Sequence, residues 1–137
     1  MKPLTVAQIA WTAGLFDGEG CVFGCKTKER RGGHIMCELV NTYYPAMTEL
    51  GKLFGGVVYT RPKSAQWKPR YSWRIWGKNA YRFALIIEPY SVIKRRQLRV
   101  LIEYHNGKPG GYFVTSKEER RRSKLLCQLK SLNGRGA

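Results

Sequence analysis

The sequence predicts an α+β fold of the order α-β-β-α-β-β-α with an added C-terminal helix, in a single domain spanning residues 1–137. Runs of alternating apolar and polar residues occur in two pairs, and helix-like stretches stand before, between and after them. A chain of 137 residues with 43% hydrophobic composition can bury a core without disulfides or a structural metal. We therefore expect the four cysteines to be reduced.

Capping signals and alternation define the elements of the first half of the chain. Thr5 and Gln8 have the spacing of a capping box, and Gly18 is expected to end the helix that they begin. Apolar and polar residues alternate beyond this helix, which predicts two strands with one buried face. The expected elements are a helix from Thr5 to Gly18, strands over 21–28 and 34–41 joined by a turn at 31–33, and a helix over 45–54.

The second strand pair has the clearest pattern in the sequence. Aromatic and aliphatic side chains share one parity and polar ones the other: Tyr71, Trp73 and Ile75 against Arg70, Ser72 and Arg74. Asn79 can cap the helix that follows, and Ser116 and Glu119 have the spacing of a second capping box. The expected elements are strands over 57–63 and 70–76 and helices over 79–87, 91–104 and 116–132.

The charge of the chain indicates a polyanionic partner. Lys and Arg number 25 against 9 Asp and Glu, which gives a net charge of +16. Such a surface repels itself unless a polyanion binds it, and nucleic acid is the first expectation. The basic residues are spread along the chain and do not gather on one amphipathic helix, and the N-terminal stretch is neither a signal peptide nor a membrane span. We expect an intracellular protein with no membrane partner and no small-molecule substrate.

The segment from Thr12 to Gly20 carries the strongest chemical signal. Small residues closed by a carboxylate recur at positions i, i+3, i+4 and i+7: Ala10, Ala13, Gly14 and Asp17. Such a stripe lets another backbone approach closely. The unpaired carbonyls at the helix end favour a cation, and Glu19, just past that end, offers an oxygen ligand suited to Mg²⁺. From these residues alone, a helix that packs on its own core and ends at Gly18 explains the pattern equally well.

The nine residues from Thr12 to Gly20 resemble the motif of the LAGLIDADG homing endonucleases, with Thr12 in place of the first Leu and Glu19 at the second acidic position. The expected order of elements over residues 5–105 also resembles the core of that family. The resemblance implies a curved antiparallel sheet that forms a DNA-binding saddle, and a motif helix that packs against its equivalent at a two-fold axis. One motif copy then implies a homodimer that cuts both strands of double-stranded DNA at a long, roughly palindromic site.

The resemblance also implies roles for single residues in metal-assisted phosphodiester hydrolysis. Glu19 and the backbone carbonyl of Gly18 are expected to bind Mg²⁺ or Mn²⁺, and the stripe of Ala10, Ala13, Gly14 and Asp17 to form the dimer interface, with Asp17 mainly structural. Asn41 resembles the polar residue that orients water near the cut, although a turn or a helix cap is an alternative role for it. Lys94 resembles the basic residue that stabilises charge near the attacking water, and its alternative is an ordinary solvated lysine. The expected catalytic residues are Glu19, Asn41 and Lys94.

The long strands are expected to supply the DNA-contacting surface, because a two-stranded ribbon fits the major groove and Arg can read guanine there. In the first strand, simple alternation directs Lys26 and Lys28 outward, whereas alignment with the family favours Phe23, Cys25 and Thr27, so its register stays open. The basic residues of the last helix contact phosphates or remain in solvent. The expected DNA-contacting residues are Lys26, Lys28, His34, Glu38, Tyr59, Arg61, Lys63, Arg70, Ser72 and Arg74.

Two other functions are consistent with a basic chain of this length. The first is a non-cleaving member of the same family, such as an intron-splicing maturase or a transcription regulator, and Glu19 argues against it. The second is a generic RNA-binding protein, but no RNA module is recognisable and the aromatic residues alternate inward. A site-specific DNA homing endonuclease is therefore the predicted function.

Overall fold

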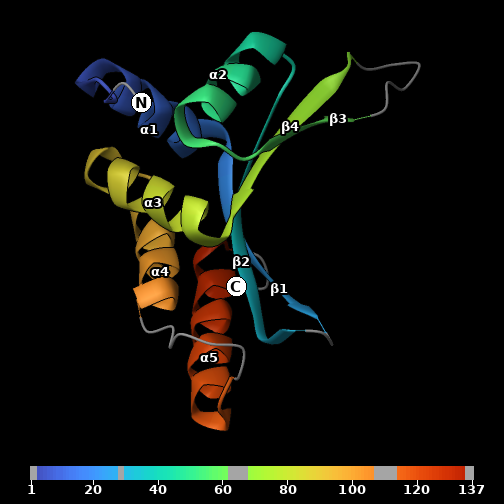
Figure 1. The fold of residues 1–137 in the computed structure, drawn as a ribbon, viewed down its shortest axis with the longest axis vertical. Coiled ribbons are helices and arrows are strands. Elements are labelled where there is room, and N and C mark those ends of the chain that lie inside the picture. Colours follow the sequence, from blue (N-terminus) through green and yellow to red (C-terminus); the bar gives the residue numbers. More distant parts are fainter. Residues whose placement is uncertain (1–2, 28–29, 62–67, 107–113, 135–137) are drawn as a thin grey trace.

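The chain folds as a four-stranded antiparallel sheet with helices on one side, which confirms the predicted fold class. The computed structural model describes residues 3–27, 30–61, 68–106 and 114–134. Its elements are α1 (Val6–Glu19), β1 (Gly20–Thr27), β2 (Arg30–Asn41), α2 (Tyr44–Phe54), β3 (Val57–Arg61), β4 (Arg70–Trp76), α3 (Gly77–Ile87), the 3-10 helix η1 (Glu88–Tyr90), α4 (Arg95–Asn106) and α5 (Ser116–Leu132). The strand order is β1-β2-β4-β3. Figure 1 shows the β1–β2 and β3–β4 hairpins extending away from the helices in different directions. Within these ranges no helix has the length and apolarity needed to cross a bilayer.

Two helices begin at side-chain caps. Thr5 Oγ1 accepts a hydrogen bond from the Gln8 backbone at 3.1 Å, and Gln8 Oε1 accepts one from the Thr5 backbone at 2.9 Å, so the predicted capping box is confirmed. The last helix has Thr115 as its cap, one residue before the predicted Ser116, and Thr115 Oγ1 accepts from the Glu118 backbone at 3.1 Å. Both candidate caps carry a hydroxyl, so local chemistry alone does not separate the two positions.

The end of α1 lies later than the sequence predicts. Gly18 does not stop the helix, which continues through Glu19, and the last cap bond runs from the Gly20 N–H to the Phe16 carbonyl. At Gly20 the chain becomes extended and enters β1, and a Cβ there would overlap the Phe16 ring. The predicted stop at Gly18 is therefore wrong, and Glu19 belongs to the last turn of α1.

Two other helix starts differ from the prediction for reasons of tertiary structure. α3 begins at Gly77 and not after a cap at Asn79, because Gly77, with φ of +64°, turns the chain from β4 directly into the helix. The helix predicted over 91–104 begins only at Arg95. The segment before it is held in a non-helical path by hydrogen bonds to the carboxylate of Asp17.

The pairing register divides the sheet into two faces. Glu38 pairs with Cys21 on one side and with Arg74 on the other, so these three residues point the same way. The buried face contains Val22, Ile35, Cys37, Leu39, Trp73 and Ile75. The opposite face, which we call the open face, contains Cys21, Phe23, Cys25, His34, Met36, Glu38, Tyr59, Arg61, Arg70, Ser72 and Arg74. The predicted parities of β2 and β4 are thereby confirmed.

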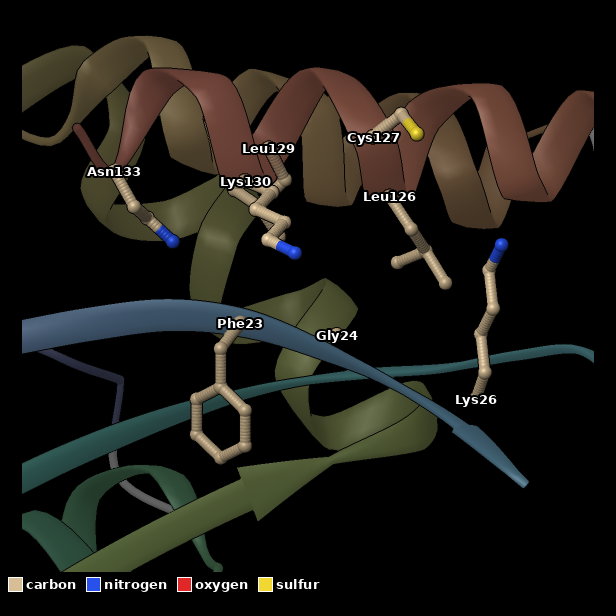
Figure 2. Close-up of a pocket in the computed structure, with 8 residues that line it drawn as sticks. All are labelled: Phe23, Gly24, Lys26, Leu126, Cys127, Leu129, Lys130 and Asn133. Atoms are coloured by element: carbon tan, nitrogen blue, oxygen red, sulfur yellow. The ribbon is translucent and has the colours of Figure 1, made fainter. Parts of the chain in front are cut away.

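β1 lies directly beneath α5, and a glycine permits this approach. A Cβ at Gly24 would lie 2.3 Å from Cδ2 of Leu126. Asn133 Nδ2 donates to the Val22 carbonyl at 2.9 Å, which ties the end of α5 to the same strand. Figure 2 shows Leu126 on one side of β1 and Phe23 on the other. Val22 and Gly24 thus belong to the helix-covered face and Phe23 to the open face.

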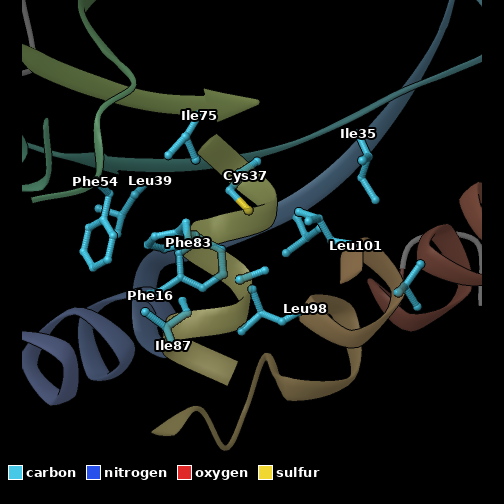
Figure 3. Close-up of a cluster of buried hydrophobic side chains, with 14 of the residues drawn as sticks. Phe16, Ile35, Cys37, Leu39, Phe54, Ile75, Phe83, Ile87, Leu98 and Leu101 are labelled. Atoms are coloured by element: carbon cyan, nitrogen blue, oxygen red, sulfur yellow. The ribbon is translucent and has the colours of Figure 1, made fainter. Parts of the chain in front are cut away.

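The core is centred on Phe83 of α3. Its ring makes edge-on contacts with Phe16, Phe54 and Trp73, at centroid distances of 5.4, 4.9 and 5.2 Å. These partners come from α1, α2 and β4, so one ring joins three elements to α3. Figure 3 shows Phe83 among these buried side chains, with Phe16 and Phe54 labelled. The packing fixes the end of α1 against the sheet, where the polar residues described next are found.

Candidate active site and nucleic-acid interface

The end of α1 meets the end of β2 at a carboxylate and an amide. Asn41 Nδ2 donates to Glu19 Oε2 at 2.5 Å, and Asn41 Oδ1 accepts from the Tyr43 backbone at 2.8 Å. Glu19 is exposed to solvent. The same Asn41 side chain therefore makes the turn that its residue type favours and also reaches the candidate metal ligand.

Asp17 ties the segment after η1 to the end of α1. Its carboxylate accepts hydrogen bonds from Ser91 Oγ and from the backbone of Val92 and Lys94, the latter two at 2.7 and 3.1 Å. Partial burial alone would raise the pKa of Asp17, but these hydrogen bonds outweigh it and hold the pKa below its usual value. All of these contacts lie within the chain, and they hold Lys94 beside the end of α1.

Cys21 lies at the start of β1, next to the end of α1 and directly opposite Glu38 of β2. Burial raises the pKa of the Cys21 thiol, the positive charge of Lys94 opposes that rise, and the negative charge of Glu38 adds to it. From the sequence, Cys21 was predicted only to be a reduced thiol. The one feature that could have placed it near the site was its closeness along the chain to Glu19.

The oxygen atoms at the end of α1 suit a divalent cation but do not complete its coordination. The exposed carboxylate of Glu19 and the carbonyl of Gly18 are hard donors of the kind that Mg²⁺ prefers. In the described part of the chain, no group of three or more His, Cys, Asp or Glu side chains could hold a metal ion. Glu19 and the Gly18 carbonyl are thus the candidate donors that this end of α1 offers to a cation.

The outer face of α1 carries small, exposed residues. Ala10 and Gly14 are exposed, and a Cβ added at Gly14 or Gly18 would meet nothing within 4 Å. Val6, one turn before Ala10, is 66% exposed. Ala13 was expected on this face, but it is fully buried in the core, so that part of the prediction is wrong. A stripe at i, i+3, i+4 and i+7 spans a wide arc of a helix, and Ala13 lies on the edge that faces the sheet.

Glu38 gathers three donors on the open face. Ser72 Oγ lies 2.7 Å, Arg74 Nε 2.5 Å and Arg61 Nη2 3.4 Å from the same oxygen, Oε2. Partial burial would raise the pKa of Glu38, but the hydrogen bonds from Ser72 and Arg74 and the charges of Arg74 and Arg61 hold it below its usual value. The Arg74 guanidinium also lies over the Tyr59 ring, 5.7 Å from its centroid.

Some of the residues predicted to contact DNA are not accessible on the open face. Lys26 points to the α5 side of β1, where it lines a cavity with Leu126 and Cys127, and it is therefore not part of the open face to which it was assigned (Figure 2). Ser72 is only 2% exposed and its hydroxyl is bound within the open face, so it supports Glu38 and is not offered to a ligand. Lys28 and Lys63 lie outside the described residues. The other predicted residues lie on the open face: His34, Glu38, Tyr59, Arg61, Arg70 and Arg74.

Comparisons with solved structures identify the fold. No family model matches this sequence, and no curated protein matches it. The homing endonuclease I-CvuI, in complex with its target, is similar at a TM-score of 0.74 and 17% identity, over 92% of this chain and 82% of that chain. An archaeal intron-encoded homing endonuclease, I-Vdi141I, complexed with DNA, gives a TM-score of 0.73 and 15% identity, over 92% of this chain and 84% of that chain. The homing endonuclease I-TnaI gives 0.62 and 20%, over 98% and 99%. The chain thus has the fold of the LAGLIDADG homing endonucleases.

Proposed function

We propose that this chain is a site-specific endonuclease for double-stranded DNA, which acts as a homodimer with Mg²⁺ or Mn²⁺. The observation that carries the proposal is the exposed carboxylate of Glu19, bound to Asn41 and flanked by the loop that carries Lys94. Homing endonucleases of the same fold have been solved with bound DNA, which supports DNA as the substrate. The net charge of +16 supports the same substrate class.

The homodimer is supported by the outer face of α1. Cutting two strands needs two carboxylates of this kind, and the sequence contains one copy of the motif. Ala10 and Gly14 are exposed and leave room for the backbone of a second helix. Self-association through one helix face is a two-fold arrangement, which brings both Glu19 residues to the same axis and makes the DNA site roughly palindromic.

Each residue of the site has a separate part in the proposed reaction. Glu19 and the Gly18 carbonyl of each copy would hold the metal ion, which, when bound, stabilises negative charge on the phosphate oxygens. Asn41, fixed by the Tyr43 backbone, orients a water molecule beside Glu19. The Lys94 ammonium adds positive charge where the phosphate becomes more negative.

Selection from a random duplex library tests the proposed function. The protein is incubated with the library and Mg²⁺, and the cut ends are sequenced, with a parallel reaction containing a chelator. We expect the cut ends to define one roughly palindromic site in the Mg²⁺ reaction only. Duplexes that are retained by the protein but never cut would overturn the nuclease assignment and indicate a non-cleaving DNA-binding protein.

A further inference from the structure

We propose that Glu38 is a positioning residue that orients the Arg74 guanidinium to read a guanine base. This role rests on the proposed DNA-binding function and concerns specificity, not cleavage. Glu38 and Arg74 are direct partners across β2 and β4, so the backbone sets the distance between them. The carboxylate takes the Nε–H of Arg74 at 2.5 Å. That contact leaves the two Nη groups of Arg74 available to donate hydrogen bonds, and a guanine edge offers two acceptors for them, O6 and N7.

The Arg74 side chain is held from more than one direction. The buried hydroxyl of Ser72 donates to the same Glu38 oxygen at 2.7 Å, and this second hydrogen bond keeps the carboxylate from rotating. The Arg74 guanidinium also lies over the face of the Tyr59 ring, with its Cζ 5.7 Å from the ring centroid. A planar guanidinium that is fixed before binding loses less conformational entropy when it meets a base.

The carboxylate also changes what Arg74 is attracted to. In a chain of net charge +16, an unpartnered arginine is drawn to the nearest phosphate, and phosphate contacts carry no direct sequence information. Pairing with Glu38 reduces that attraction and leaves hydrogen-bond geometry to decide where the guanidinium binds. Arg61 reaches the same oxygen at a longer distance, 3.4 Å, so its orientation depends less on Glu38.

Arg70 provides the matched comparison. It lies on the same strand and the same open face, is exposed, and in the described residues makes no side-chain hydrogen bond or ion pair. We infer that Arg70 serves as a mobile phosphate contact and Arg74 as a fixed base contact. Arg70→Ala should weaken binding to all sequences alike, whereas Arg74→Ala should remove a guanine preference at one symmetric pair of positions.

The test is a binding selection from a random duplex library with Ca²⁺ present, using the full chain and its Glu38→Gln, Arg74→Ala and double variants. Glu103→Gln on α4 removes one negative charge from an exposed position and serves as the charge control. Glu38→Gln should lower the guanine preference at one symmetric pair of positions by about tenfold, without lowering affinity for unrelated duplex. The double variant should lose no more preference than Arg74→Ala, because Glu38 acts through Arg74. Ser72→Ala, which leaves the charge in place, should give a smaller loss at the same positions.

The outcomes separate this role from the proposed function. A parent chain that enriches no sequence overturns both. A parent chain that enriches a site, with the same guanine preference in Glu38→Gln, overturns the role of Glu38 alone. A loss that is spread over all positions means that Glu38 only stabilises the sheet, and thermal melting of each variant would then show a matching loss of stability.

Discussion

The two hairpins of the sheet differ both in what supports them and in what they present on the open face. The β1–β2 hairpin is backed mainly by α5, whereas the β3–β4 hairpin is backed mainly by α2 and α3. Apart from Glu38, which binds Arg74, the β1–β2 hairpin presents neutral or soft side chains: Phe23, Cys25, His34 and Met36. The β3–β4 hairpin presents cationic and hydroxyl-bearing ones: Tyr59, Arg61, Arg70 and Arg74. Two similar pieces of backbone thus offer two kinds of chemistry to one ligand.

The hairpins are also held in place from opposite sides. Behind the β1–β2 hairpin, Leu126 packs on Gly24, and the Tyr104 hydroxyl donates to the Gly33 carbonyl at 2.7 Å. In front of the β3–β4 hairpin, Glu38 of β2 binds Arg74 across the strands. Helix packing therefore holds the β1–β2 hairpin in position. The β3–β4 hairpin is stabilised in part by side chains that lie on the open face itself. We expect mutations behind the sheet and mutations on its open face to have separable effects.

The largest effect is expected at the end of α1, outside the residues that either hairpin presents on the open face. Glu19→Gln should reduce strand cleavage at least about a hundredfold, because it removes the charged oxygen that would hold the metal ion, a contribution of several kcal/mol. DNA affinity should stay within a few-fold, since both open-face hairpins are unchanged. Cleavage of the selected duplex and filter binding are measured side by side. Cutting at the parental rate would show that Glu19 is not the metal ligand.

The next largest effect is expected at the outer face of α1. Gly14→Leu adds a side chain where its own chain has nothing within 4 Å, so the isolated fold should tolerate it. In a homodimer the same side chain would hold two helices apart, at a cost of about 1–3 kcal/mol for each copy. Sedimentation should show a dimer for the parent and a monomer for the variant, with thermal melting as the folding control. A monomeric parent protein would contradict the proposed two-fold arrangement, and with it the expectation of a palindromic site.

The sequence pattern was sufficient to predict which face of the sheet each residue of β4 occupies, but it was insufficient for β1. In β4, aromatic and aliphatic residues alternate with arginines, so the face of every residue follows from the sequence alone. In β1, glycine and cysteine interrupt the alternation of apolar and polar residues, and the pairing register shifts between Cys25 and Thr27. The face of β1 that is covered is the one where Gly24 lies against Leu126, about a hundred positions away along the chain. Sequence pattern assigns strands with one strongly apolar face, but it cannot anticipate which face a distant helix will cover.

The candidate site shows the same division between local and distant causes. Glu19 was named both from its place at the end of a helix and from a resemblance, whereas Asn41 and Lys94 were named from the resemblance alone. The structure brings Asn41 and the loop of Lys94 to the end of α1. The network around Glu38 was not predicted, because its donors lie 23 to 36 residues further along the chain. The sequence did contain one signal for this network: Glu38 is an acidic residue on a face that is otherwise basic, and an unpaired carboxylate there would attract the neighbouring arginines.

A smaller effect is expected from loosening the support of the β1–β2 hairpin. Leu126→Ala should cost about 2 kcal/mol of unfolding free energy, at the low end for a buried leucine because this side chain lies near the edge of the core. The base preferences contributed by the β1–β2 hairpin should weaken, while those contributed by Arg74 should remain. Denaturant unfolding and the binding selection are compared on the same preparation. Equal weakening of both sets of preferences would mean that the sheet responds as one rigid body, and that the two hairpins are not supported independently.

The smallest effect concerns what the β1–β2 hairpin reads. Its half-buried Phe23, Cys25 and Met36 are suited to contact the methyl group of thymine in the major groove, in contrast to the arginines of the other hairpin. Replacing thymidine by deoxyuridine removes only that methyl group, so binding should weaken by about 0.8 kcal/mol, or about fourfold, for every methyl group that the hairpin buries. The binding selection is run with two random libraries, one made with each nucleoside. We expect thymine preferences to vanish from the deoxyuridine library while the guanine preference attributed to Arg74 persists. Phe23→Ala should make the two libraries give the same result at the affected positions. A preference for uracil over cytosine that survives in the deoxyuridine library would point to a hydrogen bond to O4, which His34 and not Phe23 is equipped to donate.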